Sequence, residues 1–183
     1  MPTGRIVILS GPSGVGKDTV IDAWAKVDPR VVRVVAYATR NRREKEVDGV
    51  DYNFVTVEKF RLLAAVGAFL EYKQVFKNYY ATPKRQTDQL LAEGKVAVLK
   101  IDVQGALDVM KLRPEAISVF LLPTSLEELE IRLETATTGK RDNVKLRLQQ
   151  AKNEIALSAN YQHRIVNDKV ADVVTKLMEL TAA

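Results

Sequence analysis

A segment near the start of the chain has the residue types and the spacing needed to hold phosphate groups. Residues Gly11 to Thr19 read Gly-Pro-Ser-Gly-Val-Gly-Lys-Asp-Thr and contain the pattern Gly-x-x-x-x-Gly-Lys. The glycines let backbone N–H groups turn toward phosphate oxygens, and Lys17 can reach the β and γ phosphates of a nucleotide. A glycine turn that binds nothing is the alternative, so the flanking elements must decide.

The residues on either side of this segment predict a strand before it and a helix after it. Ile6 to Ser10 is a short β-branched run that indicates a buried strand. From Thr19 to Val27 the apolar residues share one helical face. A strand, a glycine-rich turn and a helix form the context of a P-loop, and the helix dipole favours anions at that end. The predicted ATP-binding residues of this loop are Gly11, Ser13, Gly14, Val15, Gly16, Lys17, Asp18 and Thr19.

The residue after the loop lysine is unusual. A Ser or Thr that ligates Mg²⁺ normally stands there, but this chain has Asp18 followed by Thr19. A carboxylate beside phosphates is repulsive unless a cation lies between them. Asp18 therefore either holds Mg²⁺, directly or through water, or caps the helix while Thr19 supplies the hydroxyl. Both interpretations stay open, and Mg²⁺ is the expected cofactor beside ATP.

Strands alternate with helices along the rest of the chain. Further strands are predicted at residues 31–36, 69–75, 96–101, 117–122 and 165–167. Further helices are predicted at residues 58–68, 83–93, 105–111, 125–134, 143–158 and 170–180, and a turn region at 78–80. This alternation predicts an α/β fold with a mainly parallel sheet flanked by helices and wound by right-handed crossovers. Polar stretches interrupt it at about 34–83 and 134–143.

Composition limits the class of protein. The chain has 183 residues, which suits one domain, and a net charge of +5, which suits either an anionic partner or an ordinary solvated surface. It has no cysteine, which excludes disulfides and thiolate chemistry and is compatible with a cytoplasmic location. The apolar run Ile6 to Leu9 is too short for a signal peptide or a membrane span. We expect no membrane association and, without an aromatic and basic platform, no nucleic-acid partner.

The first polar stretch contains side chains that could bind a second phosphorylated molecule. Arg40 and Arg43 lie three residues apart and could clamp a phosphate, while Tyr52 and Tyr80 could each offer a phenol to it. Glu71 could accept two N–H donors from the edge of a base. Taken singly, each has an ordinary alternative as a solvated residue, a core aromatic or an ion-pair partner.

Together these residues fall within a series of motifs that resembles the guanylate kinase family. The motifs are Gly11–Lys17, Thr39-Arg40-x-x-Arg43, Glu46–Phe54, Phe69–Glu71, Asn78–Thr82, Ile101–Ala106 and Ile165–Asp168. Their order and spacing hold from residue 5 to about residue 175. The resemblance implies transfer of the γ-phosphoryl group of ATP to GMP, with Mg²⁺, to give GDP and ADP.

The resemblance also implies an architecture and a role for each matching residue. It implies a P-loop NTPase-type fold with a core at 1–33, 84–126 and 150–183, an inserted nucleoside monophosphate (NMP)-binding subdomain at 34–83 and a short lid at 127–149. The implied GMP site is Arg40, Arg43, Tyr52, Glu71, Tyr80, Thr82 and Asp102, with Glu71 and Thr82 reading the guanine. Asn167 is expected near the adenine, and the expected catalytic residues are Lys17, Arg40, Arg43, Arg132 and Arg147. The expected metal ligands are Asp18, Thr19 and Asp102.

Asp18 and three further positions depart from the family pattern. Ala36 replaces a serine and removes a hydroxyl from the base site, and Lys100 replaces an acidic residue. Lys100 either adds positive charge near the acceptor phosphate or forms an ion pair with Asp18. Ala136 stands where a lid arginine is expected, and Lys140 or Arg141 could substitute for it.

Two rival functions remain at this point. Ribose 1,5-bisphosphate phosphokinases resemble guanylate kinases and carry Gly-Lys-Asp at this position, but they generally lack the motif Glu46–Phe54 that this chain has. Guanylate-kinase-like domains of scaffold proteins bind phosphorylated peptides, but they have typically lost the cradle that Lys17 completes here. GMP is the preferred acceptor, and the chain is expected to act as a monomer or a homodimer.

Overall fold

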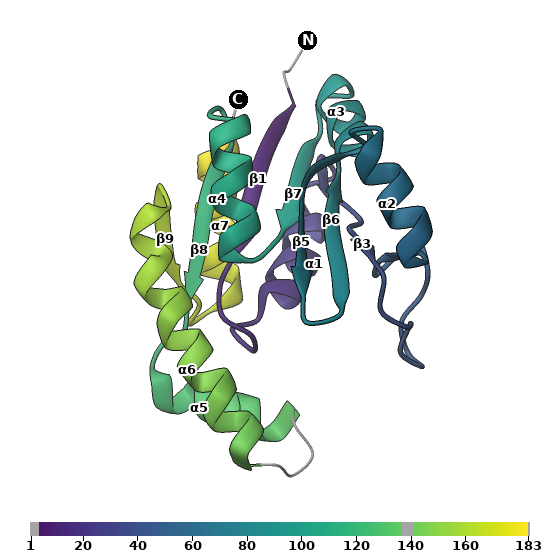
Figure 1. Ribbon diagram of the computed structural model, residues 1–183. Helices are drawn as coiled ribbons and strands as arrows, with labels where there is room; N and C mark the ends of the chain where they lie inside the picture. The colour runs from purple at the N-terminus through teal and green to yellow at the C-terminus, as the bar shows by residue number, and fades with distance from the viewer. Residues whose placement is uncertain (1–3, 137–140, 183) are drawn as a thin grey trace.

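The computed structural model describes residues 4–136 and 141–182 and shows a parallel sheet with helices on both faces (Figure 1). The strand order of this sheet is β2-β7-β1-β8-β9, and every neighbouring pair is parallel. The bounds are β1 Arg5–Ser10, β2 Val31–Arg33, β7 Val96–Lys100, β8 Ile117–Leu122 and β9 His163–Val166. The predicted α/β class and parallel sheet are confirmed.

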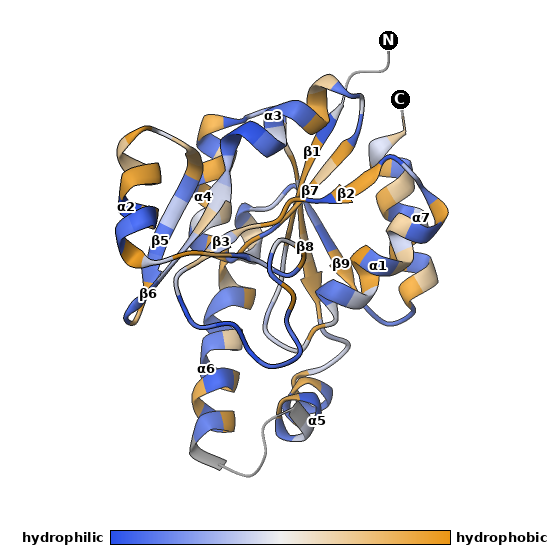
Figure 2. Ribbon diagram, turned by 90° about the vertical axis from the view of Figure 1, so that its right-hand side faces the viewer, coloured by the Kyte–Doolittle hydropathy of each residue, from blue (hydrophilic) through white to orange (hydrophobic). Residues whose placement is uncertain are grey.

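Alternation along β1 divides the core between the two faces of the sheet. Val7 and Leu9 pack with α1 (Lys17–Val27) and α7 (Val170–Thr181) on one face. Ile6 and Ile8 pack with α3 (Lys84–Ala92) and α4 (Val103–Leu112) on the other. Successive side chains of a strand point to opposite faces, so a continuous apolar run is required when helices cover both. Figure 2 shows this concentration of hydrophobic residues in β1, β7 and β8.

The carboxyl ends of the central strands set the location of the site. The phosphate-loop residues begin at Gly11, directly after β1, and Leu9 of β1 is paired with Lys100, the last residue of β7. Arg33 ends the neighbouring strand β2. In open α/β sheets ligands bind beyond these carboxyl ends, so three chain segments converge where a ligand is expected.

A second, four-stranded sheet lies beside the first, in the order β4-β3-β6-β5 (Figure 1). Its elements are β3 Tyr37–Ala38, β4 Asn53–Phe54, α2 Val57–Ala65, β5 Phe69–Val75 and β6 Asn78–Pro83. The turn predicted at residues 78–80 is wrong, because these residues open β6, which pairs antiparallel with β5. The strand predicted at 31–36 is likewise too long, because β2 ends at Arg33 and the chain crosses to the second sheet.

Two helices, α5 (Leu126–Ala136) and α6 (Arg141–Leu157), form the lower part of the molecule in Figure 1. They pack through a small apolar cluster of their own, which includes Leu129, Leu133 and Val144. Ser125 caps α5, since its hydroxyl accepts a hydrogen bond from the backbone N–H of Glu128 at 3.0 Å. The compensation suggested for Lys140 and for the side chain of Arg141 lies outside the described residues. Within 4–136 and 141–182, no helix combines the length and the apolar character that crossing a bilayer would require.

Candidate active site

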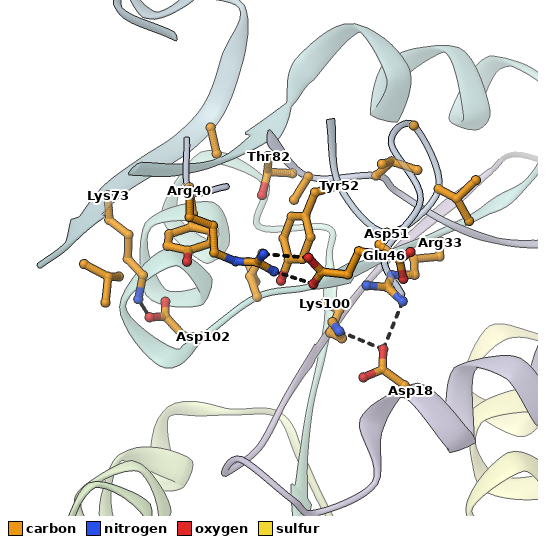
Figure 3. Close-up of a pocket in the computed structure, with 18 of the residues that line it drawn as sticks. Asp18, Arg33, Arg40, Glu46, Asp51, Tyr52, Lys73, Thr82, Lys100 and Asp102 are labelled. Carbon is orange, nitrogen blue, oxygen red and sulfur yellow. Dashed lines mark hydrogen bonds and ion pairs between the residues drawn. The ribbon is translucent and has the colours of Figure 1, made fainter. Parts of the chain in front are cut away.

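A cavity of about 1040 Å³ lies beyond the carboxyl ends of the parallel strands and is bounded by both sheets (Figure 3). It is lined by residues of α1, β2, β5, β6 and β7 and of the segment between β3 and β4. Every side chain of the predicted GMP site contributes to this lining: Arg40, Arg43, Tyr52, Glu71, Tyr80, Thr82 and Asp102. The structure therefore brings together residues that are up to 62 positions apart, from Arg40 to Asp102.

Glycine allows the backbone conformation of the phosphate loop, and Asn167 stabilises the loop through a hydrogen bond. Gly16 has φ of 100°, and a Cβ there would come within 2.8 Å of Nδ2 of Asn167. That same nitrogen donates a hydrogen bond to the Val15 carbonyl at 2.8 Å, and Asn167 is only 5% exposed. Only glycine meets both demands at position 16. Asn167 thus supports the loop, and its expected contact with adenine stays a prediction.

Lys17 folds back onto the loop that it completes. Its ammonium donates to the carbonyl oxygens of Gly11 at 2.5 Å and Pro12 at 3.0 Å. Burial lowers the pKa of Lys17 to about 8, although the carboxylate of Glu154 on α6 acts in the opposite direction. The loop therefore holds a cation at its centre, where the phosphates of ATP would lie.

Two arginines of the lower helices reach the same loop. Arg147 on α6 donates to the Ser13 hydroxyl at 2.6 Å. Arg132 on α5 donates to the Val15 carbonyl at 3.4 Å and forms an ion pair with Glu128, one helical turn away. The structure thus places the predicted catalytic residues Lys17, Arg132 and Arg147 around one loop.

The clamp arginines are organised by Glu46, which the motif contained but which we did not predict as a site residue. Arg40 donates two hydrogen bonds to the Glu46 carboxylate, at 2.6 and 2.5 Å, and its guanidinium lies 5.1 Å from the ring centroid of Tyr52. The backbone N–H of Arg43 donates to the same carboxylate at 2.9 Å. Hydrogen bonds from Arg40 lower the pKa of Glu46 to about 2, so it stays ionised. Arg40 is thereby fixed in place, whereas the Arg43 side chain is exposed.

Glu71 and Thr82 form a pair across the β5–β6 hairpin. The Thr82 hydroxyl donates to Oε1 of Glu71 at 2.7 Å, and the two residues are register partners. The other oxygen, Oε2, would lie 2.8 Å from a Cβ placed on Gly105 of α4. Burial raises the pKa of Glu71. The carboxylate is therefore fixed between the Thr82 hydroxyl and the helix α4.

Three cations on the cavity wall give the site its remaining charge, and two of them were not predicted. Lys73 lies on the same face of β5 as Glu71 and contacts the carboxylate of Asp102. Arg33 and Lys100 both bind Asp18, at 2.9 and 2.7 Å, which confirms the suggested pair of Lys100 and Asp18. Lys73 could have been predicted, because residues two apart on a strand share a face and Lys73 lies two residues after Glu71. No feature of the sequence around Arg33 indicates a place in the site.

The predicted metal ligands Asp18 and Asp102 differ in how many of their oxygens are available to a metal ion. Mg²⁺ usually takes one or two carboxylates in addition to phosphates and water. Asp102 uses one oxygen to cap α4 at the Gly105 N–H, and the other faces Lys73. Asp18 is 61% exposed, and its ion pairs use only Oδ1. Among the described residues no three His, Cys, Asp or Glu side chains converge as a metal site. Asp18 therefore fits Mg²⁺ that arrives with ATP better than Asp102 does, and the role expected of Thr19 stays a prediction.

Comparison with known proteins agrees with this geometry. A family model described as guanylate kinase matches residues 3–183. A guanylate kinase of Oceanobacillus iheyensis is 42% identical over 174 residues, 95% of this chain and 84% of that protein. One of Thermosynechococcus vestitus is 39% identical over 180 residues, 98% of this chain and 93% of that protein. The crystal structure of guanylate kinase from Anaplasma phagocytophilum superposes with a TM-score of 0.79 at 31% identity, covering 98% of this chain and 85% of that one. The chain belongs to the guanylate kinase family.

Proposed function

We propose that the chain transfers the γ-phosphoryl group of ATP to GMP and so forms ADP and GDP. One observation carries this proposal: the cavity that holds the base-reading pair of Glu71 and Thr82 and the clamp residue Arg40 extends to Asp18, the residue that follows Lys17 of the phosphate loop. A donor site alone would suit any P-loop kinase. The pair adds a carboxylate that can accept two N–H groups from one edge of guanine.

The reaction requires little covalent chemistry from the protein. An oxygen of the GMP phosphate forms a bond to the γ-phosphorus of ATP, and the bond to the bridging β–γ oxygen breaks, leaving its electron pair on ADP. The attacking oxygen is already anionic, so no strong base is needed. Arg40 and Arg43 would hold the acceptor phosphate in line, and Lys17 would bind the transferred group. Mg²⁺ carried by ATP, with Asp18 as its protein contact, would neutralise charge on the phosphates.

Glu71 supplies the selection of the base. Its carboxylate would accept from N1–H and the amino group of guanine, while Thr82 holds Oε1 in place. Adenine has no N–H at N1, so a buried carboxylate would be left unpaired beside it. AMP should therefore be rejected by orders of magnitude.

A second acceptor is favoured by one specific observation. Arg33, Lys73 and Lys100 add three cations to the wall of the cavity, more than one phosphate requires. A sugar bisphosphate such as ribose 1,5-bisphosphate would use these charges without a base. Glu71 argues against this acceptor, because its carboxylate would face an anion.

The test is a coupled assay of ADP release with Mg·ATP and each of five acceptors: GMP, dGMP, AMP, UMP and ribose 1,5-bisphosphate. We expect GMP to give the highest kcat/KM, with dGMP next and AMP and UMP near background. No GMP-dependent turnover would overturn the proposal, and turnover confined to ribose 1,5-bisphosphate would establish the alternative.

A further inference from the structure

The carboxylate of Asp18, directly after the loop lysine, lies between two cations. Nζ of Lys100 and Nη1 of Arg33 both donate to Oδ1 of Asp18, at 2.7 and 2.9 Å (Figure 3). The side chains of Lys100 and Arg33 are only 18% and 24% exposed, whereas that of Asp18 is 61% exposed. The cations are therefore fixed in the cavity wall, and the carboxylate is the member of the cluster that can turn away.

The position of these cations is between the two predicted phosphate sites. Lys100 ends β7, which pairs with the strand β1 that leads into the phosphate loop, and Arg33 ends β2, the next strand beyond β7. Lys100 and Arg33 line the same cavity as Arg40, the acceptor clamp. The charge of Lys100 also depresses the pKa of Lys17, so the two ammonium groups lie near each other. A group that passes from the loop to the clamp would cross this point.

The hydrogen-bond donors at this point exceed the acceptors that they contact. Lys17, Lys100 and Arg33 carry three positive charges, and the nearby carboxylates are Asp18 and Asp22 on α1 and Glu154 on α6, which acts on Lys17. One oxygen of Asp18 serves both Lys100 and Arg33, although an ammonium has three donors and a guanidinium five. A phosphoryl group, with three oxygens and more charge, would satisfy these donors better than one carboxylate oxygen does.

We propose that Lys100 and Arg33 form a third phosphate subsite that binds the phosphoryl group in transit, and that Asp18 occupies this subsite until substrates arrive. The proposal rests on the proposed function, because it assigns these residues to the same reaction. When both substrates are bound, oxygens of the γ-phosphoryl group replace Oδ1 of Asp18 as partners of Lys100. Lys100 then donates to the charge that spreads over these oxygens as the bond to ADP breaks, and Asp18, released from Lys100, is free to contact the Mg²⁺ that ATP carries.

The experiment uses adenosine-pentaphosphate-guanosine, a single molecule that carries both nucleosides and a phosphate chain across the cavity. Its binding to Lys100→Met, measured by calorimetry, should weaken about 10- to 100-fold, as expected for a lost charged hydrogen bond. Binding of ADP alone and of GMP alone should change by less than about threefold, since neither spans the subsite. The kcat for GMP phosphorylation should fall with the affinity for the bridging molecule, while both KM values stay near those of the wild type.

The matched control is Lys111→Met, which removes a lysine that is 79% exposed on α4. Lys100→Arg retains a cation and should recover most of the lost affinity, and the thermal unfolding of each variant shows whether it folds. Absence of GMP turnover by the wild-type chain would overturn the proposed function and this inference with it. Wild-type turnover together with a Lys100→Met variant that behaves like Lys111→Met would overturn this inference alone. Equal weakening of ADP, GMP and the bridging molecule would also overturn it.

A second variant tests the role given to Asp18. In buffer without Mg²⁺, Asp18→Asn should bind adenosine-pentaphosphate-guanosine at least as tightly as the wild type, because a competing carboxylate has been removed. An equally large loss in Asp18→Asn and Lys100→Met would contradict the exchange of partners, because Asp18 would then be needed in the bound state.

Discussion

At the scale of single residues, the most consequential property of the site is the buried ammonium of Lys17. Its pKa of about 8 means that the free chain loses this charge as pH rises above 8. Binding of ATP needs the charged form, so the affinity should be level below pH 8 and then fall about tenfold for each further pH unit. Calorimetric titration with ATP from pH 6.5 to 9.5 would measure this fall.

Lys17→Arg is the control for that profile, because a guanidinium does not lose its proton in this range. Its affinity for ATP can be lower at every pH, but the fall above pH 8 should be absent. A fall of equal slope in the arginine variant would assign the titration to another group.

A change at Glu71 should affect the binding of GMP but not the binding of ATP. Glu71→Gln keeps the shape of the side chain but replaces one acceptor by a donor, which would face the N–H groups of guanine. We expect KM for GMP to rise about 10- to 100-fold with KM for ATP unchanged within about twofold. Glu93→Gln, at an exposed position after α3, is the matched control. Equal damage to both KM values would contradict the base-reading role.

At the scale of elements, the β5–β6 hairpin turns at a residue poorly suited to its conformation. Phe76 has φ of 53° and is 86% exposed, so its ring contributes little burial while its Cβ opposes the left-handed backbone. Phe76→Gly should raise the free energy of unfolding by about 0.5–1 kcal/mol in urea denaturation. Phe76→Ala loses the same ring but keeps the Cβ, so it should show no such gain. Equal stability of the two variants would show that the backbone is not strained.

The sequence predicts the parallel sheet better than it predicts the second sheet. Helices cover both faces of the run Ile6–Ser10, and a strand buried on both faces has a continuous apolar sequence. The sequence of this run is therefore enough to predict the strand. The strands β3 and β4 have two residues each, which is too few to show a period. Pairing with β5 extends β6 to Asn78, whereas the residues at 78–80 by themselves predict a turn.

The site residues also divide into those that local sequence predicts and those that depend on the tertiary fold. Lys17 and the residues that shape its loop are local in sequence and were predicted from spacing alone. Residue type alone suggests Arg40 and Glu71 as acceptor residues, but the resemblance is needed to join them with Asp102 in one site, because only the tertiary fold brings the three to one cavity. Arg33 had no signal, because its role depends on a partner fifteen residues away, Asp18, that faces it across two elements.

At the scale of the whole molecule, the separate packing of α5 and α6 gives the cavity room to change. The cluster of Leu129, Leu133 and Val144 holds α5 and α6 together and is distinct from the two clusters of the parallel sheet. Parts that pack internally can move as bodies at a modest cost, and closing them around substrates would exclude water from the reaction. The division into a core, an NMP-binding subdomain at 34–83 and a lid at 127–149 is therefore a prediction about motion.

The chain suits a direct measurement of that motion, because it contains no native cysteine that would compete for labels. Nitroxide labels at Phe76→Cys, on the hairpin tip, and Ile131→Cys, on α5, report the separation of the two outer parts, and both positions are exposed. Adenosine-pentaphosphate-guanosine should shorten and narrow the distance distribution, since the ligand contacts both parts. The distance between labels at Val27→Cys and Leu112→Cys, two exposed positions on helices that flank the parallel sheet, should not change. A shift of equal size in both pairs, or in neither, would contradict the division into a fixed core and two closing parts.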